Sequence, residues 1–122
     1  MINAMIFAAG LGTRLHPYTA NCPKALVKIG QFSLLEIALK KLERLPVSRV
    51  VVNVHHHAAQ VVDFIKNYQT TNFEIVISDE TEHLLDTGGG LRKAASLFHE
   101  ELPILIYNAD VLTTANLNEL LR

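Results

Sequence analysis

A chain of 122 residues with a net charge of −1 fits one globular domain. Its balanced charge lacks the excess of basic residues that is typical of domains that bind nucleic acid. Hydrophobic residues make up 49% of it, yet no run is long enough to span a membrane and no secretory signal is convincing, so no membrane partner is expected. The single cysteine, Cys22, cannot form an internal disulfide and favours a cytoplasmic location.

Apolar runs alternate with amphipathic stretches along the chain. The runs are continuous, as in strands covered on both faces, and the stretches repeat apolar residues at helical spacing. Ser33 is a candidate N-cap, with Glu36 as its capping-box partner. In chain order the sequence predicts a strand at 5–9, a helix at 33–45, a strand at 49–54, a helix at 58–68, a strand at 73–77, a helix at 90–98, a strand at 103–107 and a short helix at 116–122.

This alternation predicts an α/β fold with a mainly parallel, Rossmann-like sheet between helices, in three αβα layers. Ligands on such sheets bind beyond the carboxyl ends of the strands. That rule selects the loop after Ala9, the segment after Val54 and the segment after Tyr107. No internal repeat or linker interrupts residues 1–122, which we expect to form one unit.

A glycine-rich loop follows the first predicted strand and includes Gly10, Gly12 and Arg14. Glycines let main-chain amides approach a phosphate closely, and the forked guanidinium of an arginine suits phosphate oxygens. The same pattern also fits a tight turn with a solvated arginine. The loop therefore indicates a phosphate site without establishing one.

Two other phosphate-binding loops fit this segment less well. The dinucleotide fingerprint of an oxidoreductase requires a third glycine where Leu15 stands, and an acidic residue where Val54 and His55 end the second strand. The Walker-type loop requires Gly-Lys-Ser/Thr, which is absent. A dinucleotide-binding domain therefore stays a disfavoured alternative.

The loop and its downstream context share a compound motif. Residues 10–19 read G-x-G-T-R-L-x-P-x-T, and residues 23–26 follow as P-K-x-L, with Ala25 in place of the usual second proline. The pair resembles the signature of the sugar-1-phosphate nucleotidyltransferase family. These enzymes join a nucleoside triphosphate to a sugar 1-phosphate and release pyrophosphate. The resemblance implies the nucleotide-diphospho-sugar transferase fold.

The resemblance also implies roles for individual residues. Lys24 would contact the sugar phosphate or the α-phosphate, and Arg14 would hold the triphosphate and the departing pyrophosphate; these are the candidate catalytic residues. A lysine outside such a motif is most simply a solvated surface residue. The candidates for binding nucleotide through the loop are Ala8, Ala9, Gly10, Gly12 and Thr13.

A second glycine-rich segment, residues 85–90, precedes a predicted helix. Its glycines allow a base or ribose to approach the main chain, and the helix N-terminus offers free amides, although a flexible loop is the simpler explanation. The segment resembles L-[ED]-T-G-G-G of the branch that includes mannose-1-phosphate guanylyltransferase-like and N-acetylmuramate-1-phosphate uridylyltransferase enzymes. In that branch it helps to hold the base, so Gly88 and Gly89 become candidates and UTP or GTP is favoured.

Asp110 ends the motif Asn108-Ala109-Asp110 after the last predicted strand. A carboxylate there is well placed to hold Mg²⁺, although aspartate is also common in turns. The resemblance to an N-G-D motif implies that Asp110 binds the metal. The run His55-His56-His57 is not expected to form a metal site, because consecutive side chains on an extended chain point in opposite directions and cannot all bind one ion. A turn after the strand, near the nucleotide, is the favoured interpretation of this run.

The resemblance covers residues 5–110, yet the family's catalytic domain is considerably longer. Its later part carries the sugar pocket and a second metal-binding aspartate, so the resemblance implies a natural or engineered fragment, a truncated relative or the ordered part of something larger. A non-catalytic nucleotide-binding or regulatory module is the alternative. The sequence leaves the base, the sugar and the oligomeric state open, although a truncated sheet edge would invite self-association to a homo-oligomer.

Overall fold

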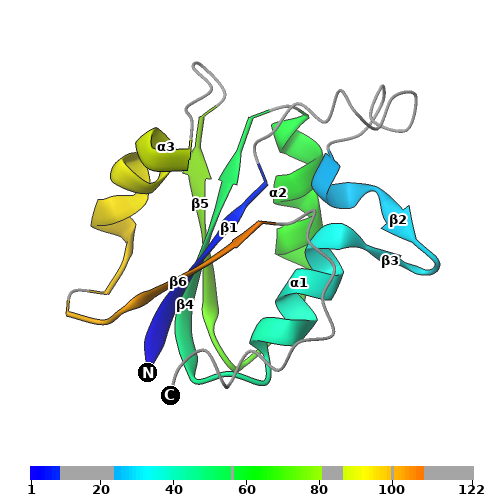
Figure 1. Ribbon diagram of the computed structural model, residues 1–122. Helices are drawn as coiled ribbons and strands as arrows, with labels where there is room; N and C mark the ends of the chain where they lie inside the picture. Colours follow the sequence, from blue (N-terminus) through cyan, green and yellow to red (C-terminus); the bar gives the residue numbers. More distant parts are fainter. Residues whose placement is uncertain (9–23, 56, 81–86, 100, 109–122) are drawn as a thin grey trace.

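The computed structural model describes residues 1–8, 24–55, 57–80, 87–99 and 101–108 (Figure 1). The predicted alternation of strands and helices is confirmed there, and the predicted helix at 116–122 lies outside these residues. The elements are β1 (Ile2–Phe7), the 3-10 turn η2 (Lys24–Leu26), β2 (Lys28–Ile29), β3 (Phe32–Ser33), α1 (Leu34–Leu42), β4 (Val47–Val54), α2 (Ala58–Asn67), β5 (Glu74–Asp79), α3 (Thr87–Ala94), the 3-10 turn η3 (Ala95–Leu97) and β6 (Ile104–Asn108).

Four strands form one parallel sheet in the order β5-β4-β1-β6, as the apolar runs predict. The register aligns the strand ends: Phe7 of β1 pairs with Asn53 of β4 and with Asn108 of β6. From β1 the chain moves outward to β4 and β5, and it then returns to the other side of β1 for β6. The strand order therefore reverses between β1 and β6.

Helices cover both faces of the sheet, which confirms the three-layer prediction (Figure 1). On one face, α1 and α2 bury the larger core; on the other, α3 and η3 cover a smaller cluster that includes Met5 and Val51. In β4, Val50 and Val52 belong to the first core and Val51 to the second. Because alternate residues enter different cores, the central positions of the strand, Val50 to Val52, are all apolar.

Helix α1 begins where its capping signal predicts, because Ser33 Oγ accepts a hydrogen bond from the Glu36 amide at 3.1 Å. It ends at Leu42, three residues before the predicted end at Leu45. Leu45 precedes Pro46, and a proline disfavours helical backbone in the residue before it. Leu45 is still buried, at 7% exposure, so its apolar character reports burial rather than helix.

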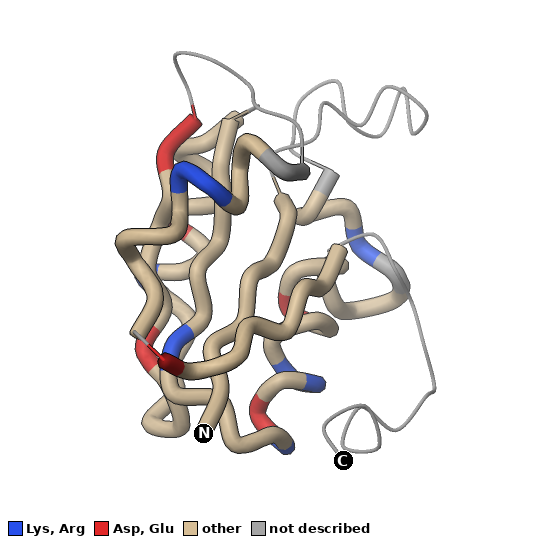
Figure 2. Tube along the Cα trace, turned by 60° about the vertical axis from the view of Figure 1, so that its left-hand side comes forward, with Lys and Arg blue, Asp and Glu red and all other residues tan. Residues whose placement is uncertain are grey.

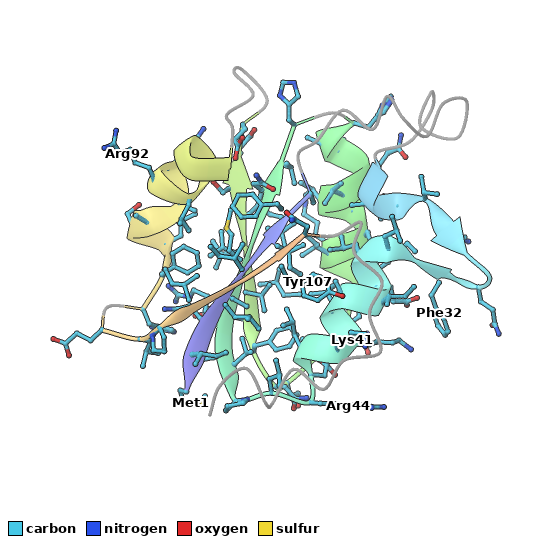
Figure 3. The ribbon with its side chains drawn as sticks, in the orientation of Figure 1. Met1, Phe32, Lys41, Arg44, Arg92 and Tyr107 are labelled. Carbon is cyan, nitrogen blue, oxygen red and sulfur yellow. The ribbon has the colours of Figure 1, made fainter. Side chains whose placement is uncertain are left out.

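A short hairpin of β2 and β3 projects beside α1, and the sequence pattern does not predict it. Its strands have two residues each, too few to show a period of two. Lys40 of α1 lies over the ring of Phe32, with Nζ 4.2 Å from the centroid. Figure 3 shows Phe32 on this outer hairpin, whereas Tyr107 of β6 belongs to the core on the α1 side.

The charged residues of the described chain are interspersed, and the view in Figure 2 shows no face of one sign. A small anion would therefore be held by local groups rather than by a broad field. Within the same residues, no helix combines the length and the apolar character needed to cross a bilayer.

Candidate functional site

The point where the strand order reverses is where open α/β sheets bind ligands, at the carboxyl ends of the strands. In Figure 1 the strands of the sheet run toward the upper edge. There β1 and β6 end side by side, with Phe7 opposite Asn108. The glycine-rich loop continues from the first of these ends, and Asp110 follows the second by two residues. The fold thus starts both segments at the same place.

Several predicted site residues lie outside the described part of the chain: Ala9, Gly10, Gly12, Thr13, Arg14 and Asp110. Lys24 is described in its backbone only, where it opens η2. The next residue, Ala25, is 1% exposed and belongs to the core under α1. A buried anchor directly after Lys24 fixes the chain at this point. The roles of these residues stay predictions.

Ala8 is the described residue of the predicted phosphate loop. Its amide donates to Asn53 Oδ1 at 2.6 Å, and the residue is 5% exposed. In this structure the amide therefore anchors the start of the loop to β4. Nucleotide contact through Ala8 stays a prediction.

A buried polar network lies behind that anchor. Asn53 is 3% exposed and Glu80, directly after β5, is fully buried. Asn53 Nδ2 donates to Glu80 Oε2 at 3.0 Å, and the Glu80 amide donates to the carbonyl oxygen of Val54 at 2.8 Å. His55 Nδ1 donates to the Glu80 carbonyl oxygen at 2.6 Å. These bonds join the carboxyl ends of β1, β4 and β5. They also give the buried polar groups the hydrogen-bond partners that such groups require.

The secondary structure of the triple glycine differs from the prediction, which places these glycines in a loop before a helix at 90–98. Helix α3 begins at Thr87, so Gly88, Gly89 and Gly90 all lie within it. Glycine disfavours a helix interior, so tertiary contacts must decide the start. Lys93 Nζ donates to the carbonyl oxygen of Asp79 and ties α3 to the end of β5.

Gly90 packs directly onto the buried network. A Cβ atom at this position would lie 3.1 Å from Glu80 Oε2 and 3.3 Å from Phe7 Cε1, which is tighter than most real Cβ contacts. The same atom would lie 3.4 Å from Asn53 Nδ2. Any side chain here would require Glu80 or Phe7 to move by a few tenths of an ångström, whereas glycine allows the close approach without such a shift. The start of α3, the predicted base-binding segment, therefore rests on the same side chains that anchor the loop after β1.

We expect Gly90→Ala to lower the free energy of unfolding by about 1 kcal/mol. Alanine gains about 1 kcal/mol of helix propensity, but overpacking against a buried, hydrogen-bonded Glu80 costs about 1–3 kcal/mol. Urea unfolding measures the balance. Ser96→Ala, at an exposed position in η3, is the control and should stay within about 0.5 kcal/mol. A stabilised Gly90→Ala variant would show that the contact yields easily.

The two described histidines of the run 55–57 have different structural roles. His55 bonds to the main chain of Glu80, and His57 adopts a left-handed backbone with φ +52° at the N-cap of α2. His56 lies outside the described residues. Across the part of the chain that the structure describes, no three His, Cys, Asp or Glu side chains gather as a metal site.

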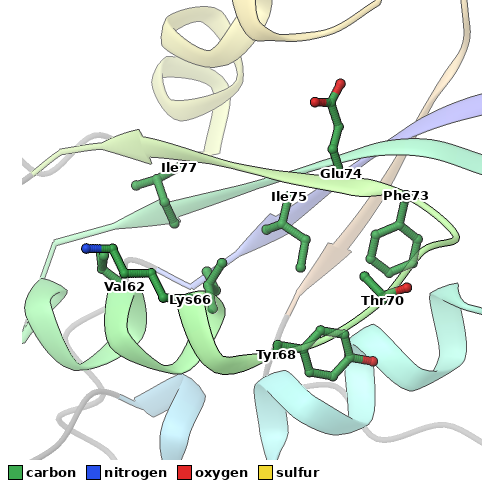
Figure 4. A pocket seen from close by; sticks show the side chains of 9 residues that line it. Val62, Lys66, Tyr68, Thr70, Phe73, Glu74, Ile75 and Ile77 are labelled. Atoms are coloured by element: carbon green, nitrogen blue, oxygen red, sulfur yellow. The ribbon is translucent and has the colours of Figure 1, made fainter.

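A groove of 470 Å³ lies elsewhere, between α2 and the edge strand β5 (Figure 4). Its walls are mostly apolar and include Val62, Ile65, Ile75 and Ile77, with Lys66 and Glu74 at the margins. None of the residues of the buried network lines it. The groove is therefore distinct from the edge where the predicted site residues start.

Sequence reasoning missed two residues of the site. The sequence pattern did not predict Asn53 or Glu80 as a site residue. Both have a signal in retrospect. Asn53 is the polar interruption of the run Val50-Val51-Val52, next to the last position of a buried strand, and Glu80 follows directly on β5. Polar side chains so placed at the carboxyl edge of a sheet are site candidates.

The profile of the nucleotidyl transferase family matches residues 3–122, and the chain belongs to that family. An N-acetylmuramate alpha-1-phosphate uridylyltransferase of Caulobacter vibrioides is 40% identical over 109 residues, covering 88% of this chain and 45% of the relative. A mannose-1-phosphate guanyltransferase of Emericella nidulans is 33% identical, over 91% of this chain and 31% of the relative. The predicted resemblance to this family and branch is confirmed.

The solved structure of HddC from Yersinia pseudotuberculosis complexed with GMP-PN superimposes with a TM-score of 0.84 at 25% identity. It covers 99% of this chain and 53% of the other. The structural likeness confirms the predicted fold class. The chain thus spans about half, or less, of the length of these relatives.

Proposed function

We propose that the protein carrying this chain transfers a nucleoside monophosphate from a nucleoside triphosphate to a sugar 1-phosphate and forms a nucleotide sugar. In this proposal residues 1–122 are the N-terminal, nucleotide-binding part. The observation that carries it is the start of the glycine-rich loop and of the Asp110 segment at neighbouring strand ends, in a chain of the nucleotidyl transferase family. Names of relatives favour UTP or GTP as the donor.

The reaction asks mainly for positioning and charge neutralisation. A phosphate oxygen of the sugar phosphate attacks the α-phosphorus in line. The bond from the α-phosphorus to the oxygen of the β-phosphate breaks, and pyrophosphate takes the electron pair. Arg14 and the loop amides would hold the triphosphate, and Lys24 would bring the anionic nucleophile to it. The nucleophile is already ionised, so no general base is required.

Mg²⁺ is the cofactor that we propose, with Asp110 as its protein ligand. The donor set fits, because Mg²⁺ prefers oxygen ligands and usually combines one or two carboxylates with phosphate oxygens and water. When bound, the ion would neutralise charge on the phosphates.

A second candidate is a nucleotide-binding or regulatory module without turnover. Such a module would bind a triphosphate and release no pyrophosphate. The cytoplasm is the proposed location in either case, and self-association to a homo-oligomer through the sheet edge is proposed for both.

The protein is incubated with each of the four common nucleoside triphosphates, Mg²⁺ and a panel of sugar 1-phosphates. The release of pyrophosphate tests the proposal. Thermal shift in the same mixtures measures binding. Binding of UTP or GTP with turnover supports the proposal, and binding without turnover supports the second candidate. A chain that binds NADH and no triphosphate would overturn both in favour of a dinucleotide-binding domain.

A further inference from the structure

The two glycine-rich segments are far apart in sequence but meet one pair of buried side chains. The loop after β1 is anchored by the Ala8 amide on Asn53 Oδ1, at 2.6 Å. The start of α3 rests through Gly90 on Glu80 Oε2. Between them, Asn53 Nδ2 donates to Glu80 Oε2 at 3.0 Å. The chain of contacts therefore runs without a gap from one segment to the other.

Burial makes this connection rigid. Glu80 is 0% exposed and Asn53 is 3% exposed, so neither side chain can exchange its partner for bulk water without opening the edge of the sheet. The main chain of Glu80 is also held, by its amide on Val54 and by His55 on its carbonyl oxygen. The side-chain amide of Asn53 is thus bonded through both its oxygen and its nitrogen, and Glu80 is bonded through both its main chain and its carboxylate.

We propose that Asn53 and Glu80 are positioning residues that couple the phosphate loop after β1 to the base-binding start of α3. The coupling rests on the proposed function for its role in nucleotide binding. A ligand that spans both segments needs them at one fixed separation, and the pair links Ala8, where the first segment starts, to Gly90 in the second. Neither side chain contacts the ligand in this proposal; they act through Ala8 and Gly90.

The pair offers a reciprocal exchange as its test. Asn53→Asp keeps an oxygen for the Ala8 amide but removes the amide donor to Glu80, so two acceptor groups face each other. The double variant Asn53→Asp with Glu80→Gln returns a donor, because the new amide can donate to the new carboxylate. Asn67→Asp makes the same chemical change at an exposed position on α2 and controls for net charge.

Amide hydrogen exchange of the ligand-free chain is the first arm. In Asn53→Asp we expect the amides of residues 8 and 88–90 to exchange about 10-fold faster, with recovery in the double variant and no change in Asn67→Asp. The Val51 amide serves as the reference for global unfolding. Unchanged exchange at residues 88–90, acceleration equal to that of Val51, or no recovery in the double variant would each overturn the coupling.

Binding is the second arm, with a nucleoside triphosphate compared with inorganic tripolyphosphate, both with Mg²⁺, by calorimetry. Asn53→Asp should weaken the nucleotide about 10-fold and tripolyphosphate markedly less, because only the nucleotide spans both segments. An equal loss of affinity for both ligands would overturn the coupling, because the pair would then position the phosphate loop alone. If the unaltered chain binds no nucleotide, the proposed function fails, while the exchange arm still decides the coupling.

Discussion

Replacing Lys24 with alanine is expected to lower the rate of pyrophosphate release by about 100-fold or more, while the unfolding midpoint changes little. The positive charge of Lys24 would hold the attacking phosphate against the donor, an interaction needed most in the transition state. Folding depends instead on its neighbour Ala25, which is 1% exposed in the core. Initial rates of pyrophosphate release and thermal unfolding of the same preparations measure the two effects.

Lys28→Ala is the matched control for this prediction. Lys28 is exposed in β2, four residues further along the chain, and lies outside the family motif. Its removal should leave the rate within about threefold, as for a surface substitution. A Lys24→Ala variant that loses stability and activity in the same proportion would contradict a role in positioning phosphate.

Replacing Asp110 with asparagine is also expected to have a large effect, on the magnesium dependence of activity. The substitution keeps the size of the side chain but removes the negative charge that would hold Mg²⁺ beside the phosphates. We expect the concentration of Mg²⁺ that gives half-maximal activity to rise by about 10-fold or more, with a lower rate at saturation. A magnesium titration of pyrophosphate release measures both quantities.

The control for Asp110→Asn is Asp63→Asn, at an exposed position on α2. It makes the same change in net charge and should leave the magnesium titration where it is. An unaltered titration in Asp110→Asn itself would exclude this residue as a metal ligand. The metal would then have to be held by other oxygen ligands.

The fold was largely accessible from the sequence because apolar periodicity reports burial directly. Runs such as Val50-Val51-Val52 predict strands buried on both faces, and Ser33 predicts the start of α1. The ends of elements were less accessible. β4 starts at Val47 rather than Arg49, because Val47 pairs with Ile2 across the sheet, and that pairing is not a property of either local sequence.

The candidate site was accessible only in part. The motifs around Gly10 and Asp110 identify candidate residues. That the strands before these motifs, β1 and β6, are neighbours depends on the strand order, and no local sequence pattern reports the reversal of that order. The pair of Asn53 and Glu80 was hidden for the same reason. Its members are 27 residues apart and meet only because β4 and β5 are neighbours in the sheet.

Replacing Mg²⁺ with paramagnetic Mn²⁺ in a complex with nucleoside triphosphate would locate the nucleotide site through NMR line broadening of backbone amides. If the nucleotide and its metal bind at the carboxyl edge of the sheet, broadening should be strongest there, at Ala8, Gly88 and Asn108. Residues at the opposite edge, such as Ile2 and Val47, should broaden least. Strongest broadening at that opposite edge, or in the groove between α2 and β5, would contradict binding at the carboxyl edge.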